Sequence, residues 1–238
     1  MGRVLFGGGN VEMSAPVAGI PASEIAVGSS VYIMENGTAA EYLVVNKGIP
    51  SNSSLYDSSC DGVWLLRKGL YEQRILDSSY ESLYSTCSLN KYLNGTFLSL
   101  LDKNAQRAIK EVKVPYFNGL NVSSSTSGLS TKIFLLSMKE VGGVVSDAYA
   151  EGAKLSYFEA GDVSSAKTLR TAMFNGTAKH WWIRTFFENG TPSIVTSGGV
   201  TAYGDFGPEL ADAYVRPAFV VPHNAVFDEK TMVLKGVA

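Results

Sequence analysis

The chain has 238 residues, of which 45% are hydrophobic and 11% aromatic, so it can bury a sizeable core. Only 18% are charged, and the formal net charge is −2 without a basic block, which excludes the electrostatic footprint of a nucleic-acid-binding protein. No apolar run approaches the ~20 residues that a membrane-spanning helix needs. The 24 glycines are about a tenth of the chain and predict extensive loops rather than a helical bundle.

Residues 1–25 are rich in Gly, Ala, Pro and Ser and show no periodicity. We expect this segment to be an attachment arm, followed by one compact domain over residues 26–238. The first residues lack an apolar stretch, so we expect no secretory signal peptide.

The first half of the domain contains local signals for strands. Residues 31–34 and 41–45 flank Asn36-Gly37, a dipeptide that readily supplies the positive φ values of a tight hairpin turn. Val63-Trp64-Leu65-Leu66 predicts a short buried strand.

A helical period follows these strands. Leu89, Tyr92 and Leu93 fall on one face of a short helix, which we expect Asn94-Gly95 to end. Asp102 can cap a further helix. Extended strands are then expected over residues 112–116 and 132–137.

Two segments near the carboxyl end each alternate large apolar residues with one arginine. They are residues 179–185, which contain Trp181, Trp182 and Arg184, and residues 214–220, which contain Arg216. We expect two core strands that form a rigid frame for the loops between them, an arrangement that proteins use to build recognition surfaces.

The cysteines and histidines are too few for a four-ligand zinc site. Cys60 and Cys87 are the only cysteines, and His180 and His223 are the only histidines. The two thiols are either bridged by a disulfide or reduced and buried. The lack of a signal peptide favours the reduced state.

Six motifs occur in a characteristic order, namely the Asn-Gly hairpin followed by residues 41–45, then residues 62–67, 88–94, 132–137 with Glu140-Val141, 181–185 and 215–219. In this order they resemble a bacterial and phage domain family of uncharacterised function with a C-type-lectin-like fold. The resemblance spans about residues 28–222. Ile183 and Thr185 stand where the family commonly has Leu and Ser.

The resemblance implies an α+β fold, with two or three short helices on a small, mostly antiparallel sheet and long irregular loops. Related members are variable proteins of diversity-generating retroelements, in which this fold displays a hypervariable ligand-binding surface. For this chain it implies a receptor-recognition protein of phage or prophage origin. Such a protein would be made in a bacterial cytoplasm and displayed on a virion surface, with residues 1–25 as its attachment arm.

The adjacent tryptophans should point to opposite faces of their strand. The resemblance implies that Trp182 is in the core and Trp181 is the more accessible ring; the alternative is that both are packed. A guanidinium inside an apolar strand needs carbonyl or carboxylate partners, so we expect structural roles for both arginines. The expected scaffold set is Trp182, Arg184, Arg216, Pro217 and Phe219.

Aromatic residues and short polar residues alternate between the two arginine-bearing segments. This composition is typical of binding surfaces such as antibody loops, although the rings could instead fill the underside of the loops. The expected ligand-contacting residues are Trp181, Thr185, Phe186, Phe187, Glu188, Asn189, Tyr203, Asp205, Phe206 and Glu209.

Enzyme motifs are absent from the sequence. There is no phosphate-binding loop, no Gly-x-Ser-x-Gly elbow and no His-Glu-x-x-His helix, so we expect no catalytic residue, cofactor or metal. The Glu-Pro-Asn, Gln-Pro-Asp and Trp-Asn-Asp signatures of calcium-dependent sugar-binding lectins are also absent.

The expected function is therefore recognition of a protein or glycan on a host cell surface, without nucleic acid and without membrane insertion. The alternative is a virion or tail module that uses the same face for assembly, as a homo-oligomer or as part of a virion.

Overall fold

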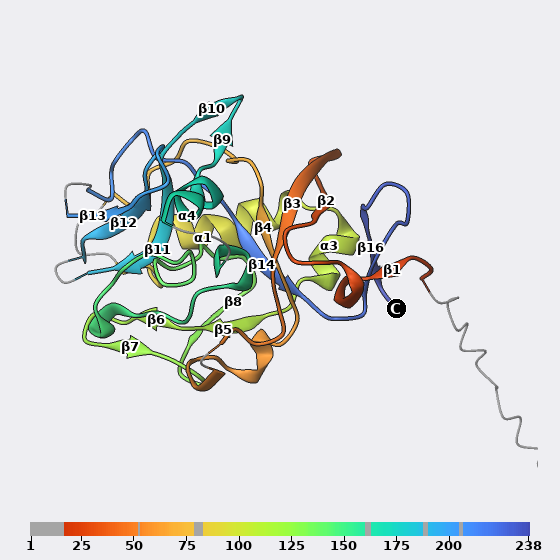
Figure 1. Cartoon of the computed structure of the whole chain (residues 1–238), viewed down its shortest axis with the longest axis horizontal. Helices are drawn as coiled ribbons and strands as arrows, with labels where there is room; N and C mark the ends of the chain where they lie inside the picture. Colours follow the sequence, from red (N-terminus) through yellow and green to blue (C-terminus); the bar gives the residue numbers. More distant parts are fainter. Residues whose placement is uncertain (1–16, 52, 79–82, 160–162, 188–189, 205–206) are drawn as a thin grey trace, which may run out of the picture.

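The computed structural model describes residues 17–51, 53–78, 83–159, 163–187, 190–204 and 207–238. Within these ranges the chain forms an α+β fold, with a few short helices and several small antiparallel sheets joined by long loops (Figure 1). The prediction of an α+β fold with short helices and mostly antiparallel strands is confirmed at this level.

A four-stranded antiparallel sheet in the order β14-β4-β3-β2 crosses the middle of the molecule (Figure 1). Its hairpin turns at Asn36 and Gly37, whose φ values of 47° and 79° are those the tight turn requires. The predicted hairpin and the predicted strand from Val63 are both confirmed. The strands are β2 (Ser30–Glu35), β3 (Thr38–Lys47), β4 (Val63–Arg67) and β14 (Ala218–Val221).

The helices lie between β4 and β5 and before β9. Asp102 caps α3 as predicted, because its carboxylate accepts a 2.9 Å hydrogen bond from the amide of Ala105. The bounds are α1 (Ser88–Tyr92), a π-helical turn (Leu93–Phe97), α2 (Leu98–Leu100), α3 (Lys103–Ala108) and α4 (Val163–Arg170). Short 3-10 turns span Ala22–Glu24, Ser53–Leu55, Ser58–Cys60, Asp147–Tyr149 and Ser156–Glu159.

The expected stop at Asn94-Gly95 is wrong, because the helical path continues through this dipeptide to Leu100. The Asn94 side chain serves a long-range contact instead. Its Oδ1 accepts hydrogen bonds from the amides of Lys132 and Ile133, at 2.9 and 3.0 Å, and its Nδ2 donates to the carbonyl of Ile133 at 2.9 Å. The side chain therefore ties the helix to a segment far along the sequence.

The remaining strands form smaller sheets. One three-stranded sheet consists of β11 (Trp181–Phe186), β12 (Pro192–Val195) and β13 (Thr201–Tyr203), and another of β1 (Ile20–Pro21), β15 (Ala225–Phe227) and β16 (Leu234–Val237). The two-stranded pairs are β5 (Val112–Val114) with β8 (Leu129–Thr131), β6 (Tyr116–Phe117) with β7 (Val122–Ser123), and β9 (Met173–Phe174) with β10 (Thr177–Ala178).

The predicted strand over residues 132–137 is wrong as a regular strand. Phe134 makes a single bridge to Ala218, and the segment is otherwise irregular, although its apolar side chains are buried. Its polar backbone groups are partly satisfied by side chains, including Asn94 and Tyr84, whose hydroxyl accepts from the Leu135 amide at 2.9 Å. Side-chain partners therefore replace strand neighbours here.

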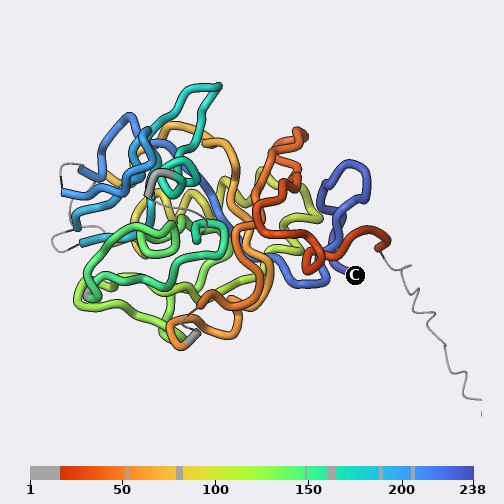
Figure 2. Tube along the Cα trace, viewed as in Figure 1, coloured from red at the N-terminus to blue at the C-terminus, as the bar shows by residue number. Residues whose placement is uncertain are grey.

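The folded part of the chain begins earlier than residue 26. Ile20 and Pro21 pair with Phe227 and Val226, and Ala22 is fully buried. Figure 2 shows the start and the end of the described chain side by side. Residues 20–25, assigned above to the arm, thus contribute to the fold; residues 1–16 lie outside the described ranges.

Hydrophobic clusters fill both faces of the central sheet. Val63 and Leu65 of β4 belong to one cluster, which also includes the buried faces of α1 and α3, whereas Trp64 and Leu66 belong to the other. This alternation is the period of two that a strand imposes. Cys60 and Cys87 are free and buried in different clusters, so they are not bridged.

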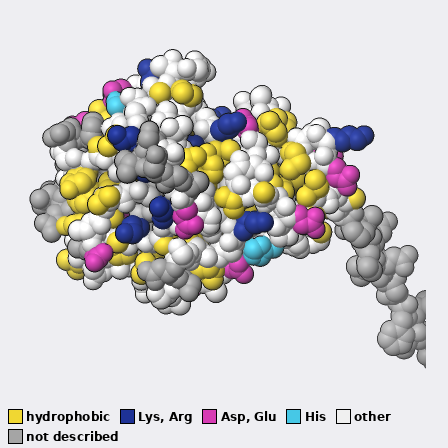
Figure 3. Space-filling view, in the orientation of Figure 1, with side chains coloured by type: hydrophobic (Ala, Val, Ile, Leu, Met, Phe, Trp, Pro, Cys, Tyr) yellow, Lys and Arg dark blue, Asp and Glu magenta, His cyan; other side chains and the backbone are white. Residues whose placement is uncertain are grey.

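Acidic and basic side chains are intermixed on the face drawn in Figure 3, in line with the low net charge. Across the described ranges, the helices are too short or too polar to cross a membrane.

Candidate functional site

The two arginine-bearing segments lie side by side. The amide of Trp182 donates to the carbonyl of Tyr214 at 3.0 Å, and the amide of Tyr214 donates to the carbonyl of His180 at 2.9 Å. The first segment includes β11 except for its last residue, and the second enters the central sheet as β14. Together they join the β11-β12-β13 sheet to the central sheet.

Both tryptophans are fully buried. Their rings enter opposite hydrophobic clusters, as expected for neighbours on a strand, and their indole nitrogens donate to the carbonyls of Arg170 and Arg74 at 3.0 and 2.8 Å. The expectation that Trp181 is the accessible ring is wrong. The ring belongs to the buried cluster that also contains Leu155 and Phe158, and the guanidinium of Arg216 lies 4.9 Å from its centre.

Arg184 forms a fully buried ion pair with Glu140. Two parallel hydrogen bonds of 2.6 Å join the guanidinium to the carboxylate, and Arg184 also donates to the carbonyls of Pro115 and Leu135 at 2.9 and 2.8 Å. The carboxylate raises the pKa of Arg184 against the opposing effect of burial. The ion pair therefore connects β11 to the irregular segment around Leu135.

A second carboxyl group, that of Glu151, lies in the same buried network. Its oxygens accept from the amide of Phe117 at 2.6 Å and from the hydroxyl of Thr185 at 2.8 Å, and one lies 4.0 Å from Nε of Arg184. Burial raises the pKa of Glu151 to about 7 despite the nearby guanidinium. Thr185 is fully buried in this network, so it does not reach a surface ligand as expected above.

Arg216 has carbonyl partners and no carboxylate partner among the described residues. It donates to the carbonyls of Arg67, Lys68 and Arg170 at 2.9, 3.3 and 3.4 Å, and its guanidinium lies 4.9 Å from the Trp181 ring centre. Burial lowers its pKa to about 10.

The other two scaffold residues lie next to Arg216 in the core. The carbonyl of Pro217 accepts from the amide of Arg67 at 2.9 Å, and the buried ring of Phe219 packs 5.1 Å from that of Tyr42.

Four aromatic rings run from the core to the surface at the end of the β11-β12-β13 sheet. Ring centres are 5.0 Å apart for Phe117 and Tyr149, 4.7 Å for Tyr149 and Phe187, and 4.0 Å for Phe187 and Tyr203. The last two rings stack with only 19° between their planes. We call these residues the aromatic row. Tyr203 at its outer end is 55% exposed, Phe187 is partly buried, and Phe117 is buried.

The other expected ligand-contacting residues do not all belong to this surface. Phe186 is fully buried in the core, where alternation along β11 places it, so its assignment as a contact residue is wrong. Glu209 is exposed on the turn beside Pro208, whose carbonyl accepts from the amides of Leu76 and Asp77 at 2.8 and 3.1 Å. Glu188, Asn189, Asp205 and Phe206 lie outside the described residues.

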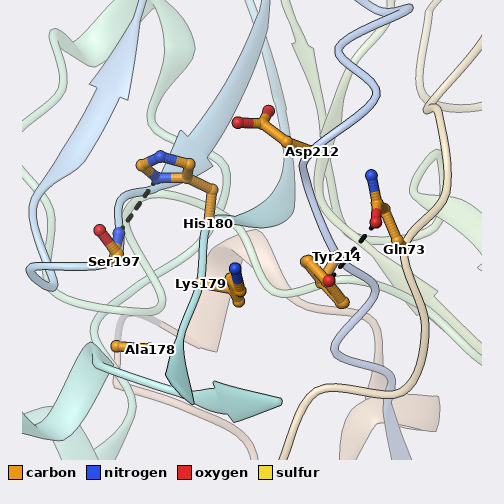
Figure 4. Close-up of a pocket in the computed structure, with 7 residues that line it drawn as sticks. All are labelled: Gln73, Ala178, Lys179, His180, Ser197, Asp212 and Tyr214. Atoms are coloured by element: carbon orange, nitrogen blue, oxygen red, sulfur yellow. Dashed lines mark hydrogen bonds between the residues drawn. The ribbon is translucent and has the colours of Figure 1, made fainter. Parts of the chain in front are cut away.

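A polar cavity of about 230 Å³ lies where the two arginine-bearing segments begin (Figure 4). The hydroxyl of Tyr214 donates to the side-chain oxygen of Gln73 at 3.4 Å, and Nδ1 of His180 accepts from the backbone amide of Ser197 at 3.1 Å. The lining residues are Gln73, Ala178, Lys179, His180, Ser197, Asp212 and Tyr214.

Ser197, His180 and Asp212 are the residue types of a hydrolase triad, but the hydrogen bond between Ser197 and His180 is not the one that a triad makes. In a catalytic triad the histidine accepts a proton from the serine hydroxyl and is oriented by the carboxylate at its other nitrogen. Here Nδ1 of His180 is instead an acceptor for the amide of Ser197. This contact differs from that of a catalytic triad, in which the carboxylate lies at this nitrogen.

A second cavity, of about 560 Å³, lies between the loop at Gly142 and α4. Three cations line it, Lys154, Lys167 and Arg170, together with exposed Val144 and Val200 and the first residue of β13, Thr201. We call it the basic cavity.

Sequence reasoning assigned no site role to the residues that hold the site from outside the two segments, although Glu140 belongs to one of the six motifs. Glu140, Glu151, Tyr149 and Arg170 all lie in or beside a stretch that is small and polar in sequence. The one available signal was that two acidic residues, Glu140 and Glu151, flank a glycine-rich segment after an apolar run. Nothing local pairs them with Arg184.

No group of three or more His, Cys, Asp or Glu side chains lies close enough to hold a metal ion in the part of the chain that the structure describes.

Comparison with known proteins identifies one family. The family described as "Domain of unknown function (DUF6273)" matches residues 61–223, from just before β4 to just after β14. No curated protein and no solved structure matches the chain. Since the matched region is more than half of the 238 residues, the chain belongs to the DUF6273 family.

Proposed function

We propose that this member of the DUF6273 family is a ligand-recognition protein that binds through the aromatic row. The observation that supports it most is Tyr203, which is 55% exposed yet stacked on Phe187. A ring held in one orientation at the surface contributes contact area to a ligand without losing much conformational freedom on binding.

The frame beneath the row favours the same function. Phe187 directly follows β11, which the buried Arg184–Glu140 pair ties to the segment around Leu135. A binding ring on a rigid element is placed more reproducibly than one on an unsupported loop. The row also ends at Phe117, whose amide is held by the carboxyl group of Glu151.

The finer fold class and the origin are part of the proposal. The order of the six motifs supports a C-type-lectin-like fold, and the α+β arrangement is compatible with it. Through that resemblance we propose a receptor-binding protein of phage or prophage origin, related to variable proteins of diversity-generating retroelements, with a protein or glycan on a host cell surface as its ligand. We also propose that the protein has no catalytic activity. The hydrogen bond from the amide of Ser197 to Nδ1 of His180 supports this part of the proposal.

A binding screen with a point variant tests this function. Labelled protein is applied to a printed glycan array and to a panel of intact bacterial cells read by flow cytometry. We expect Tyr203→Ala to lose the signal on the probes that the unmodified protein binds, because the stacked surface is removed. The matched control is Tyr32→Ala, a partly exposed tyrosine of β2 in the central sheet.

Equal loss in both variants would indicate a general defect, and an unchanged signal for Tyr203→Ala would contradict the proposal. Size-exclusion chromatography of the same samples tests the alternative, a module that uses this face for assembly. A stable oligomer that Tyr203→Ala dissociates would replace ligand display with self-association.

A further inference from the structure

The basic cavity has an excess of positive charge. Lys154, Lys167 and Arg170 line it, and no carboxylate side chain lines it among the described residues. The ammonium groups of Lys154 and Lys167, both exposed, make no ion pair with any described residue. Three cations that line one cavity without a counter-charge make its electrostatic potential positive, so an anion that enters the cavity is attracted.

Arg170 is the unusual member, because it is a buried cation with no carboxylate partner. It is 7% exposed, and it donates from Nε to the carbonyl of Gly199 at 2.7 Å and from Nη1 to the carbonyls of Val141 and Gly142 at 3.3 and 3.2 Å. Burial lowers its pKa, with no charged neighbour acting on it. Nη2 has no hydrogen-bond partner among the described residues and is not a buried unsatisfied atom, so it keeps some contact with solvent; Arg170 is one of the residues that line the cavity.

Gly142 brings two of the cations together. Its φ of +73° suits glycine, and a Cβ placed there would lie 2.8 Å from the Lys154 side chain and 3.8 Å from Nη1 of Arg170. The Lys154 stem therefore lies across the loop that Arg170 holds by hydrogen bonds.

The basic cavity adjoins the aromatic row. Thr201 lines the cavity, and Tyr203 lies two residues further along β13, on the same face of the strand. A ligand stacked on Tyr203 can therefore place a substituent in the cavity. Exposed Val144 and Val200 give the cavity an apolar rim, with exposed fractions of 91% and 43%.

We propose that the basic cavity binds an oxyanion group, that is a carboxylate, sulfate or phosphate, of the ligand that contacts the aromatic row. The proposal rests on the proposed function for the identity of that ligand, but the oxyanion site itself can be tested alone. Arg170 offers a positioned guanidinium nitrogen, and the two lysines are point charges that adapt to the shape of the anion.

Simple anions serve as the probes. Sodium sulfate, sodium phosphate and sodium acetate are titrated separately into ¹⁵N-labelled protein at constant ionic strength adjusted with sodium chloride, and amide shifts are followed. We expect saturable shifts of the Gly142, Gly143 and Thr201 amides. The three salts distinguish the oxyanion types, since the one with the lowest apparent Kd identifies the preferred group.

Lysine variants assign the binding to the cavity. We expect the double variant Lys154→Gln with Lys167→Gln to raise the apparent Kd at least tenfold, because two of the three cations are removed. Lys91→Gln, an exposed lysine of α1, is the control and should stay within twofold. Because both changed lysines are exposed, we expect the double variant to keep its fold. Well-dispersed amide signals in its ¹⁵N spectrum would show this.

Three results would overturn the oxyanion site: no saturable shifts, equal shifts with chloride alone, or unchanged binding in the double variant. Tyr203→Ala should leave the sulfate titration unaltered. The anion titration therefore tests the basic cavity whether or not the aromatic row binds a ligand. The loss of ligand binding in Tyr203→Ala tests the aromatic row whether or not the cavity binds an anion.

Discussion

The guanidinium of Arg184 and the carboxylate of Glu140 form two parallel hydrogen bonds of 2.6 Å, and neither side chain is exposed to solvent. The pair links β11, which leads to the aromatic row, to a segment without regular secondary structure. Irregular chain has few backbone hydrogen bonds of its own, so a buried side-chain pair of this kind has a large share in fixing its position.

Glu140→Gln should strongly destabilise the protein, because it removes the carboxylate that forms two short hydrogen bonds with the buried guanidinium and leaves only the carboxyl group of Glu151, 4.0 Å away. We expect a loss of about 3–5 kcal/mol in the free energy of unfolding, measured by urea denaturation. The control is Glu41→Gln, which breaks a solvent-exposed pair with Lys68 and should cost about 1 kcal/mol or less. Similar losses in the two variants would show that the buried pair has no special role.

The stability should depend on pH through Glu151. Burial raises the pKa of this carboxyl group from 4.5 to about 7, so the folded chain holds the proton more tightly than the unfolded chain does. The contribution of Glu151 to the free energy of unfolding therefore falls as the pH rises from about 4.5 to about 7, and is constant above that range.

Glu151→Gln isolates this effect, since the amide keeps the shape of the neutral acid. We expect the variant to gain stability relative to the unmodified protein as the pH rises through this window, by up to about 3 kcal/mol. Urea denaturation at pH 4.5, 6 and 8 measures the difference. A difference that does not change with pH would contradict the raised pKa.

The two thiols should be unreactive in the folded protein. Burial raises the pKa of both Cys60 and Cys87 to about 12, so the reactive thiolate is scarce at neutral pH. We expect dithionitrobenzoate to label neither cysteine in native buffer and both in 6 M guanidinium chloride. Rapid native labelling would show exposure of a thiol, and absence of labelling after unfolding would indicate a disulfide.

Local sequence signals predicted local structure well. The Asn36-Gly37 turn and the Asp102 cap depend on residues within a few positions of each other, and both are present. Asn94-Gly95 is the same kind of signal with a different outcome. There the Asn94 side chain binds the backbone at Lys132 and Ile133, and these distant partners stabilise a helical path that the dipeptide alone disfavours.

The site was harder to predict because burial depends on which segments cover a strand. The alternation of Trp181 and Trp182 predicted that their rings lie on opposite faces of the strand. It did not predict that residues of the 142–159 segment, such as Leu155, belong to the same buried cluster as Trp181. The stack of Phe187 on Tyr203 similarly requires β11 and β13 to be held on either side of β12. Neither relationship can be read from the spacing of residues along the chain.

One variant, Tyr203→Ala, tests most directly whether the exposed end of the aromatic row binds a ligand. Its affinity and its stability are measured on the same sample. With the array or cell probe that the unmodified protein binds best, we predict at least a tenfold loss of affinity and a change in the free energy of unfolding of about 0.5 kcal/mol or less, as for other surface substitutions. An unchanged affinity in a folded variant would contradict a binding role for the row, and so would a collapsed fold, because Tyr203 would then be a structural residue.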